Sequence, residues 1–175
     1  MSPANNQILA SQIKIKIGGT ELQQDIMDDL KYAQVDQHVL LPAMFSLTFL
    51  LKPDLKLLDG NMFDLGKEVE ILSQDPDRNN QSVTLMKGEI TALEPNFGDG
   101  MIAELMVRGF DKSHRMFRET KSKSWLNTKD SDIASKVASA AGLQTDVEQT
   151  TQVFEHIFQH NQTDMEFLMQ RAWRI

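Results

Sequence analysis

The sequence predicts a β-rich α+β protein, in which an antiparallel barrel or sandwich precedes a smaller segment that contains both helix and strand. Two observations predict this class. Up to about residue 111, short runs alternate apolar with polar side chains and are separated by turn residues. Beyond residue 129, two runs take helical spacing and begin at capping residues. We therefore expect a β-barrel domain over residues 1–120 and part of an α/β domain over residues 121–175.

The first half of the chain contains three strand patterns. Ile13–Ile17 alternates isoleucine with lysine, and the following Gly18–Gly19 predicts a tight turn. Phe45–Leu51 and Glu68–Leu72 alternate in the same way. The polar segment 22–30 is expected to be a connector or a short helical turn.

Two longer strand patterns complete the predicted β-domain. Val83–Leu93 is interrupted by Gly88, where we expect a bulge or a bend. Met101–Phe110 is the last strong strand pattern. Asp75–Asn80 has the composition of a loop, and Pro95–Gly100 predicts a turn.

Capping residues divide the last part of the chain into helix, strand and helix. Asp130 is the expected N-cap of a helix that Gly142 ends. Val153–Gln159 has the residue mix of a strand. Thr163 can cap a last helix, and Glu166 completes a capping box. This helical pattern continues to the last residue, so we expect the chain to end inside a second domain.

The composition argues against several classes of protein. The 175 residues are enough to bury a core without covalent cross-links. Because cysteine is absent, disulfides and thiolate metal sites are excluded, and the formal charge of −7 argues against a general nucleic-acid-binding protein. The sequence begins without a secretory signal pattern, and its longest charge-free run, Val39–Leu51, is shorter than the ~20 residues of a spanning helix. We expect synthesis in the cytoplasm and no membrane insertion.

A basic run between the two predicted domains is the candidate interface. Its members are Lys112, Arg115, Arg118, Lys121 and Lys123. In an acidic chain, such a run can dock an acidic partner, including a neighbouring copy of the chain. It can equally be a solvated linker between domains, and both interpretations stay open.

Two histidines four residues apart raise the question of a metal site. His156 and His160 would share a face of a helix, but their neighbours favour a strand. On a strand they would share one face at about 13 Å, at ~3.3 Å per residue. Because the sequence places no third ligand, we expect no metal site.

Other chemically suggestive residues lack the surroundings that a site requires. Asp25, Asp28 and Asp29 are close in sequence, but the order of a calcium-binding loop is absent. No nucleophile, phosphate-loop or dinucleotide motif occurs, so we expect no catalytic residue, no cofactor and no enzymatic activity. Trp125 and Trp173 lie near amphipathic sequence and are expected to be buried.

Several segments together resemble one family, the phage late control D and Vgr spike proteins of contractile injection machines. The segment Arg108–Arg118 carries the resemblance most clearly. The similar blocks occur in the family's order and cover nearly the whole chain. They are Leu41–Phe49, Phe63–Ile71, Gly88–Pro95, Arg108–Arg118, Thr128–Leu143 and Gln159–Leu168.

The resemblance implies a tail-tube-like β-barrel followed by the start of a small α/β insertion domain. It implies a baseplate hub that joins a sixfold tail tube to a threefold spike, without enzymatic activity. The implied partners are further copies in a homotrimer of the full-length form, the tail-tube protein, and spike-tip or baseplate proteins. The implied location is an assembled phage tail or injection-system baseplate. An alternative is a cell-wall glycan-binding module, which the helix-then-turn pattern of Asp130–Leu143 also resembles.

Overall fold

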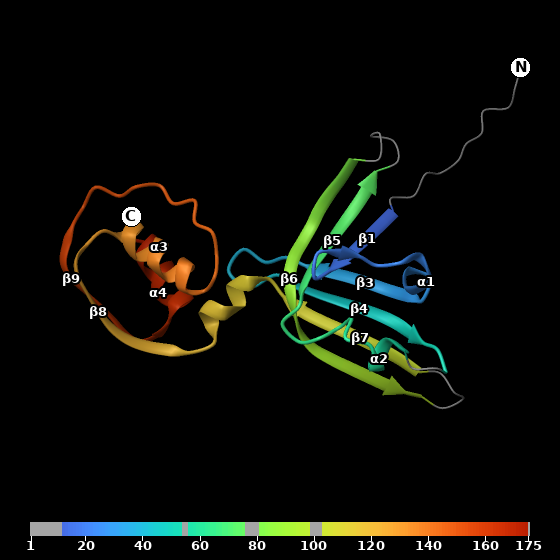
Figure 1. The fold of residues 1–175 in the computed structure, drawn as a ribbon. Helices are drawn as coiled ribbons and strands as arrows, with labels where there is room; N and C mark the ends of the chain where they lie inside the picture. Colours follow the sequence, from blue (N-terminus) through green and yellow to red (C-terminus); the bar gives the residue numbers. More distant parts are fainter. Residues whose placement is uncertain (1–11, 54–55, 76–80, 99–102, 175) are drawn as a thin grey trace, which may run out of the picture. The chain divides into compact units, whose positions relative to one another are not determined.

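The computed structural model describes residues 12–53, 56–75, 81–98 and 103–174. The chain divides into two compact units, Met1–Asp111 and Lys112–Ile175 (Figure 1). The division thus precedes the boundary predicted after residue 120. The reason is that Met116, on the 3-10 helix η2 (Lys112–Phe117), is buried in the core of the second unit.

The first unit contains one seven-stranded sheet, whose hydrogen-bonded order is β2-β1-β5-β6-β7-β4-β3. Every neighbouring pair is antiparallel, which confirms the predicted β-rich class. The sheet curls around its core, but no backbone pairing between described residues joins β3 to β1 or β2. The elements are β1 (Gln12–Ile17), β2 (Thr20–Glu21), α1 (Gln24–Met27), β3 (Leu30–Asp36), β4 (Met44–Leu51), α2 (Lys56–Asp59), β5 (Glu68–Asp75), β6 (Gln81–Phe97) and β7 (Ala103–Phe110).

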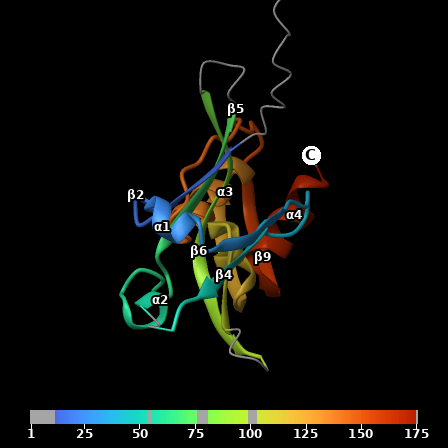
Figure 2. The same ribbon diagram turned by 90° about the vertical axis from the view of Figure 1, so that its right-hand side faces the viewer.

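Strand β6 is one bent strand that serves both halves of the sheet (Figures 1 and 2). It pairs with β5 up to Glu89 and with β7 from Glu89 onwards. Extra residues at Leu85 and Thr91 shift the register on either side of this change of partner. The strand continues through Gly88, and the bulge or bend expected in this region is present as a bent strand with one extra residue on either side. β6 also extends to Phe97, beyond the start of the predicted turn at 95–100.

Both glycines at this change of partner are required by close packing. A Cβ on Gly88 would lie 2.5 Å from the carbonyl oxygen of Phe110. A Cβ on Gly109 would lie 2.1 Å from the carbonyl oxygen of Glu89 and 2.4 Å from the ring of Phe45. These positions therefore need the smallest residue because strands and core side chains meet there, and not because of a turn.

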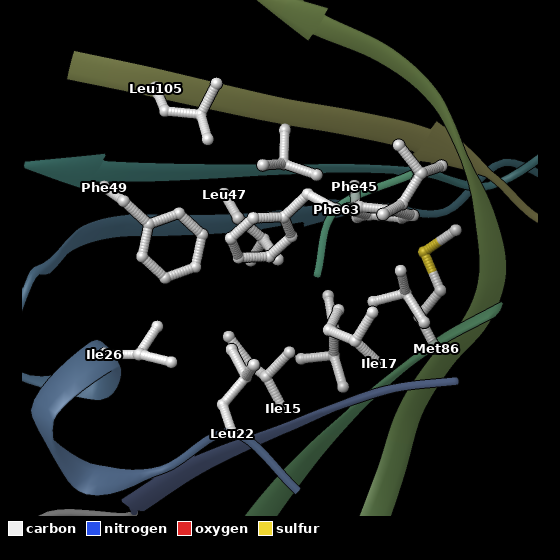
Figure 3. Close-up of a cluster of buried hydrophobic side chains, with 14 of the residues drawn as sticks. Ile15, Ile17, Leu22, Ile26, Phe45, Leu47, Phe49, Phe63, Met86 and Leu105 are labelled. Carbon is white, nitrogen blue, oxygen red and sulfur yellow. The ribbon is translucent and has the colours of Figure 1, made fainter. Parts of the chain in front are cut away.

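The core of the first unit fills the inside of the curled sheet (Figure 3). Phe45, Leu47 and Phe49 of β4 are fully buried, and their side chains face those of β1, including Ile15 and Ile17. Full burial of one such side chain contributes about 1.5–3 kcal/mol. The alternation read from the sequence is therefore the pattern that builds this core.

The second unit combines a two-stranded antiparallel sheet with two helices. Its main hydrophobic side chains are Trp125, Ile157 and Phe167, and the Trp125 and Phe167 rings stack with centroids 6.5 Å apart. This confirms the predicted α/β character of the segment. The elements are β8 (Thr120–Thr128), α3 (Asp130–Ala140), β9 (Phe154–Thr163) and α4 (Asp164–Ala172).

Helix α3 begins differently from the sequence prediction and ends as predicted. Its N-cap is Lys129, whose side chain makes no capping bond, so the assignment of Asp130 as N-cap is wrong. Thr150 supplies the cap instead, because its hydroxyl oxygen accepts from the Ser131 amide at 3.2 Å. Gly142 follows the C-cap with a φ of 76°, which confirms the predicted stop.

Helix α4 has the predicted capping box. The Thr163 hydroxyl accepts from the Glu166 amide at 3.2 Å, and the Glu166 carboxylate accepts from the Thr163 amide at 2.8 Å. The bond from the Thr163 backbone lowers the pKa of Glu166 below its usual value. The sequence pattern predicted that this helix continues to Ile175, but α4 ends at Ala172.

Candidate functional site

The basic run lies entirely in the second unit, where it is part of folded structure. Lys112, Arg115 and Arg118 are on η2 or follow it directly, and Lys121 and Lys123 are on β8. The interpretation as a solvated linker is therefore wrong. Its alternative, a surface for an acidic partner, stays a prediction.

Two members of the run stabilise helix ends within their own unit. Lys121 donates to the Asp164 carboxylate at 2.6 Å, at the start of α4, and lies 3.3 Å from Glu119. The bond to Asp164 is the main reason why the pKa of Lys121 is raised. Arg115 donates to the Ala141 carbonyl at 3.2 Å, at the end of α3. Such contacts satisfy or neutralise helix termini, so these two side chains have structural roles.

Two further members of the run contact neighbouring side chains of their own segments. Arg118 lies against His114 within η2 and the residues that follow it. The Lys123 ammonium lies 3.9 Å from the ring centroid of Trp125, a cation–π contact on β8. Trp125 is buried, as predicted. Trp173 is 78% exposed, so its expected burial is wrong.

The two histidines lie on β9, which confirms the strand predicted there. His156 and His160 are exposed on one face, with Phe158 between them at centroid distances of 6.3 and 5.7 Å. His156 also lies 3.3 Å from the Ser124 hydroxyl. Among the described residues, no three His, Asp or Glu side chains are grouped so that they could hold a metal ion.

The carboxylates around α1 each have a separate partner. Asp25 accepts from the Ile26 amide at 3.0 Å, and Asp28 accepts from the Gln24 amide group at 2.8 Å. Asp29 pairs with Lys52 at 2.7 Å. Each carboxylate thus contributes to local structure, and the three do not converge on one point.

A buried ion pair in the second unit was missed by the sequence analysis. Arg171 of α4 donates to both oxygens of Asp130 on α3, at 2.7 and 3.0 Å, and both side chains are about nine-tenths buried. The guanidinium also lies 4.6 Å from the ring centroid of Phe154. Because the partners are distant in sequence, no local pattern marks the pair.

Open strand edges are the other candidate interaction sites. In the described part of the chain, β3 has no partner on its outer edge, and β1 is covered there only where β2 pairs with it. In the second unit, β9 pairs with β8 on one edge alone. Unpaired main-chain donors and acceptors can bind a further strand.

Two open clefts lie beside β9 and the end of α4, with volumes of about 610 and about 710 Å³. Phe154, Arg171 and Arg174 line both of them. The smaller cleft follows β9, and the larger one includes Asp130 and the segment 148–152. No helix in the described part of the chain is long and apolar enough to cross a membrane.

Solved structures of tail and secretion proteins share this fold. A 43 kDa tail protein of prophage MuSo2 from Shewanella oneidensis matches with a TM-score of 0.69 and 17% identity, over 94% of this chain and 48% of that chain. A chain of the lidded PdpA–VgrG complex of Francisella matches with a TM-score of 0.66 and 14% identity, over 97% of this chain and 26% of that chain. An E. coli component of the type VI secretion system matches with a TM-score of 0.54 and 15% identity, over 89% of this chain and 41% of that chain.

These likenesses show the fold that this chain shares with part of a phage tail protein, of a chain in a PdpA–VgrG complex and of a type VI secretion component, in keeping with the family that the sequence resembles. The chain spans less than half the length of each of these structures. The family model that matches is the Alg8 N-terminal domain, over residues 9–174, rather than a late control D or Vgr model. The chain therefore belongs to the Alg8 N-terminal domain family. No curated protein sequence matches it.

Proposed function

We propose that this member of the Alg8 N-terminal domain family is a non-enzymatic structural part of a contractile injection machine, at the baseplate hub between tail tube and spike. The observation that carries the proposal is the shared fold, which extends over 94% of the chain in the match to a prophage tail protein. The match includes both units, and not the β-sheet alone, since it reaches beyond Asp111.

The first unit has the features that a ring-forming hub requires. Its core is continuous and apolar, so the curled sheet is a rigid body. Its open edges at β3 and β1 offer main-chain groups to neighbouring subunits. Strand pairing between subunits would transmit mechanical load without any catalytic group.

The proposed assembly contains three copies of the full-length protein. Each copy would contact the tail-tube protein on one side and spike-tip or baseplate proteins on the other. In this assembly the protein needs no cofactor, and it would be recovered with injection particles.

Light scattering after size exclusion, on the complete product of the reading frame, tests the proposal. We expect a trimer whose mass does not change with concentration. A monomer at all concentrations would exclude the hub. Retention of that monomer on purified cell wall would favour the glycan-binding alternative instead.

Cysteine cross-linking in purified particles tests the edges directly, because residues 1–175 contain no cysteine that would compete with introduced ones. Tyr32→Cys on β3 combined with Gln12→Cys on β1 is expected to give cross-linked copies after mild oxidation. Leu65→Cys, at an exposed position outside both strands, is the control. Equal cross-linking of the control and the edge variant would contradict pairing at these edges.

A further inference from the structure

The cleft beside β9 follows the open edge of a strand. Its lining includes His156 and Phe158, which are exposed on one face of β9, and Ile157, which is buried on the other face. Because side chains alternate between faces, a cleft lined from both faces lies at the strand edge. Gln170 and Arg174, at the end of α4, form the opposite wall. The cleft therefore has room for an extended segment beside β9.

The charges in this cleft are of one sign. Its ionisable lining residues are Arg171, Arg174, His156 and His160, and no carboxylate of the described chain lines it. Arg171 is neutralised by Asp130. Arg174 has an exposed side chain and makes no ion pair with a described residue. Among the described residues, Arg174 is therefore the cation of this cleft without an ion-pair partner, and the nearest acidic lining, Asp130 and Glu148, belongs to the neighbouring larger cleft.

The exposed side of β9 adds an aromatic surface next to this charge. Phe158 is 49% exposed and is flanked by the rings of His156 and His160. In an antiparallel pair, side chains on the added strand would lie about 4.5–5.5 Å from such positions. A segment that alternates β-branched with acidic residues would therefore fit the edge, the rings and the guanidinium together.

We propose that the second unit binds an extended acidic segment of a partner protein as a third strand along β9, with a carboxylate opposite Arg174. A second copy of β9 is a poorer occupant, because it would bring the same imidazoles together and its sequence holds a single carboxylate, Glu155. Strand addition provides main-chain hydrogen bonds, and the charge selects the partner. This binding is separate from the assembly of the first unit.

Fluorescence anisotropy with two labelled peptides tests the proposal on the whole chain. The peptides alternate threonine with glutamate in one case and with lysine in the other. The glutamate peptide is expected to bind about tenfold more tightly, with an affinity that falls as salt is added. Arg174→Glu should weaken its binding at least about fivefold, whereas Lys136→Glu, on the exposed surface of α3, should change it by less than about twofold.

Amide chemical shifts of the labelled protein locate the peptide. We expect the largest changes, and new protection from hydrogen exchange, over residues 154–162. Equal affinity for the two peptides, an unaffected Arg174→Glu variant, absence of saturable binding, or changes confined to another strand would each overturn the proposal.

Discussion

The two units of this chain are stabilised by different kinds of contact. The first has a large apolar core inside a curled sheet, built by strands whose sequences alternate. The second has a smaller apolar core and adds a buried ion pair that joins its two α-helices, Asp130 with Arg171, whereas ion pairs of the first unit, such as Lys16 with Glu70, are partly exposed. The stability of the first unit should therefore depend mainly on the size and shape of its core residues. The stability of the second unit should depend also on single charged side chains.

Breaking the buried ion pair should have the largest effect. Arg171→Met leaves the Asp130 carboxylate buried without its partner, which should reduce the free energy of unfolding of the second unit by about 3–5 kcal/mol. Both tryptophans lie in that unit, so denaturant unfolding followed by tryptophan fluorescence measures it. Combining Asp130→Leu with Arg171→Met should restore most of the loss. A double variant as unstable as the single one would show that packing, and not charge, sets the cost.

In the first unit, the substitution with the largest expected loss of stability is Gly109→Ala, which acts through crowding. The added methyl group would overlap the carbonyl oxygen of Glu89 and the ring of Phe45, so we expect a loss of about 3 kcal/mol. Hydrogen exchange of β4 and β7 measures the loss, while tryptophan fluorescence should be unchanged. Gly18→Ala is the control, because its Cβ has open space and only its φ of 57° is unfavourable, at about 1 kcal/mol. Equal losses would argue against crowding at Gly109.

Removing the capping box should have a smaller effect, again in the second unit. Thr163→Ala leaves the Glu166 amide without its acceptor and should reduce stability by about 1 kcal/mol. Thermal unfolding followed by tryptophan fluorescence is the measurement. Thr163→Ser keeps the hydroxyl and should retain most of the stability, whereas a loss as large as that of alanine would exclude the cap as its cause.

The smallest effect concerns a charged cluster on the first unit. Lys16, Lys87 and Thr84 bond to Glu70 and lower the pKa of its carboxyl from 4.5 to about 2, with Lys16 as the main cause. Because the pKa is depressed in the folded state, the stabilisation is complete above about pH 4.5 and is lost as the pH falls towards 2. Glu70→Gln should flatten the pH dependence of unfolding in this range, as followed by circular dichroism. An unchanged slope would show that the cluster does not stabilise the fold.

Local patterns predicted the elements that depend on neighbours in sequence. The alternation of Ile13–Ile17 and Phe45–Leu51 corresponds to β1 and β4, because one face of each strand is buried. The capping box of α4 and the glycine that ends α3 were also predictable, since each involves residues within one or two turns. β8 was missed because its side chains are mostly polar, and only Trp125 and Thr128 are buried among them.

The candidate sites were predictable only as residue types. The basic run was visible in the sequence, but Lys121 stabilises α4 and Arg115 stabilises α3, through partners that no spacing rule identifies. The open edge of β9, and Arg174 beside it without an ion pair to a described residue, were equally hidden, because no local sequence pattern shows which strands pair with an edge.

Sequence patterns were sufficient to predict the β-rich class of the fold, the mixed segment that follows it, and the capping box of the last helix. These follow from periodicity and from hydrogen bonds between residues near one another in the chain. The folded chain was needed to find the change of partner at Glu89, the crowding at Gly109 and the pairing of Asp130 with Arg171. Those contacts join residues far apart in sequence, so they depend on strand register and on the packing of whole elements.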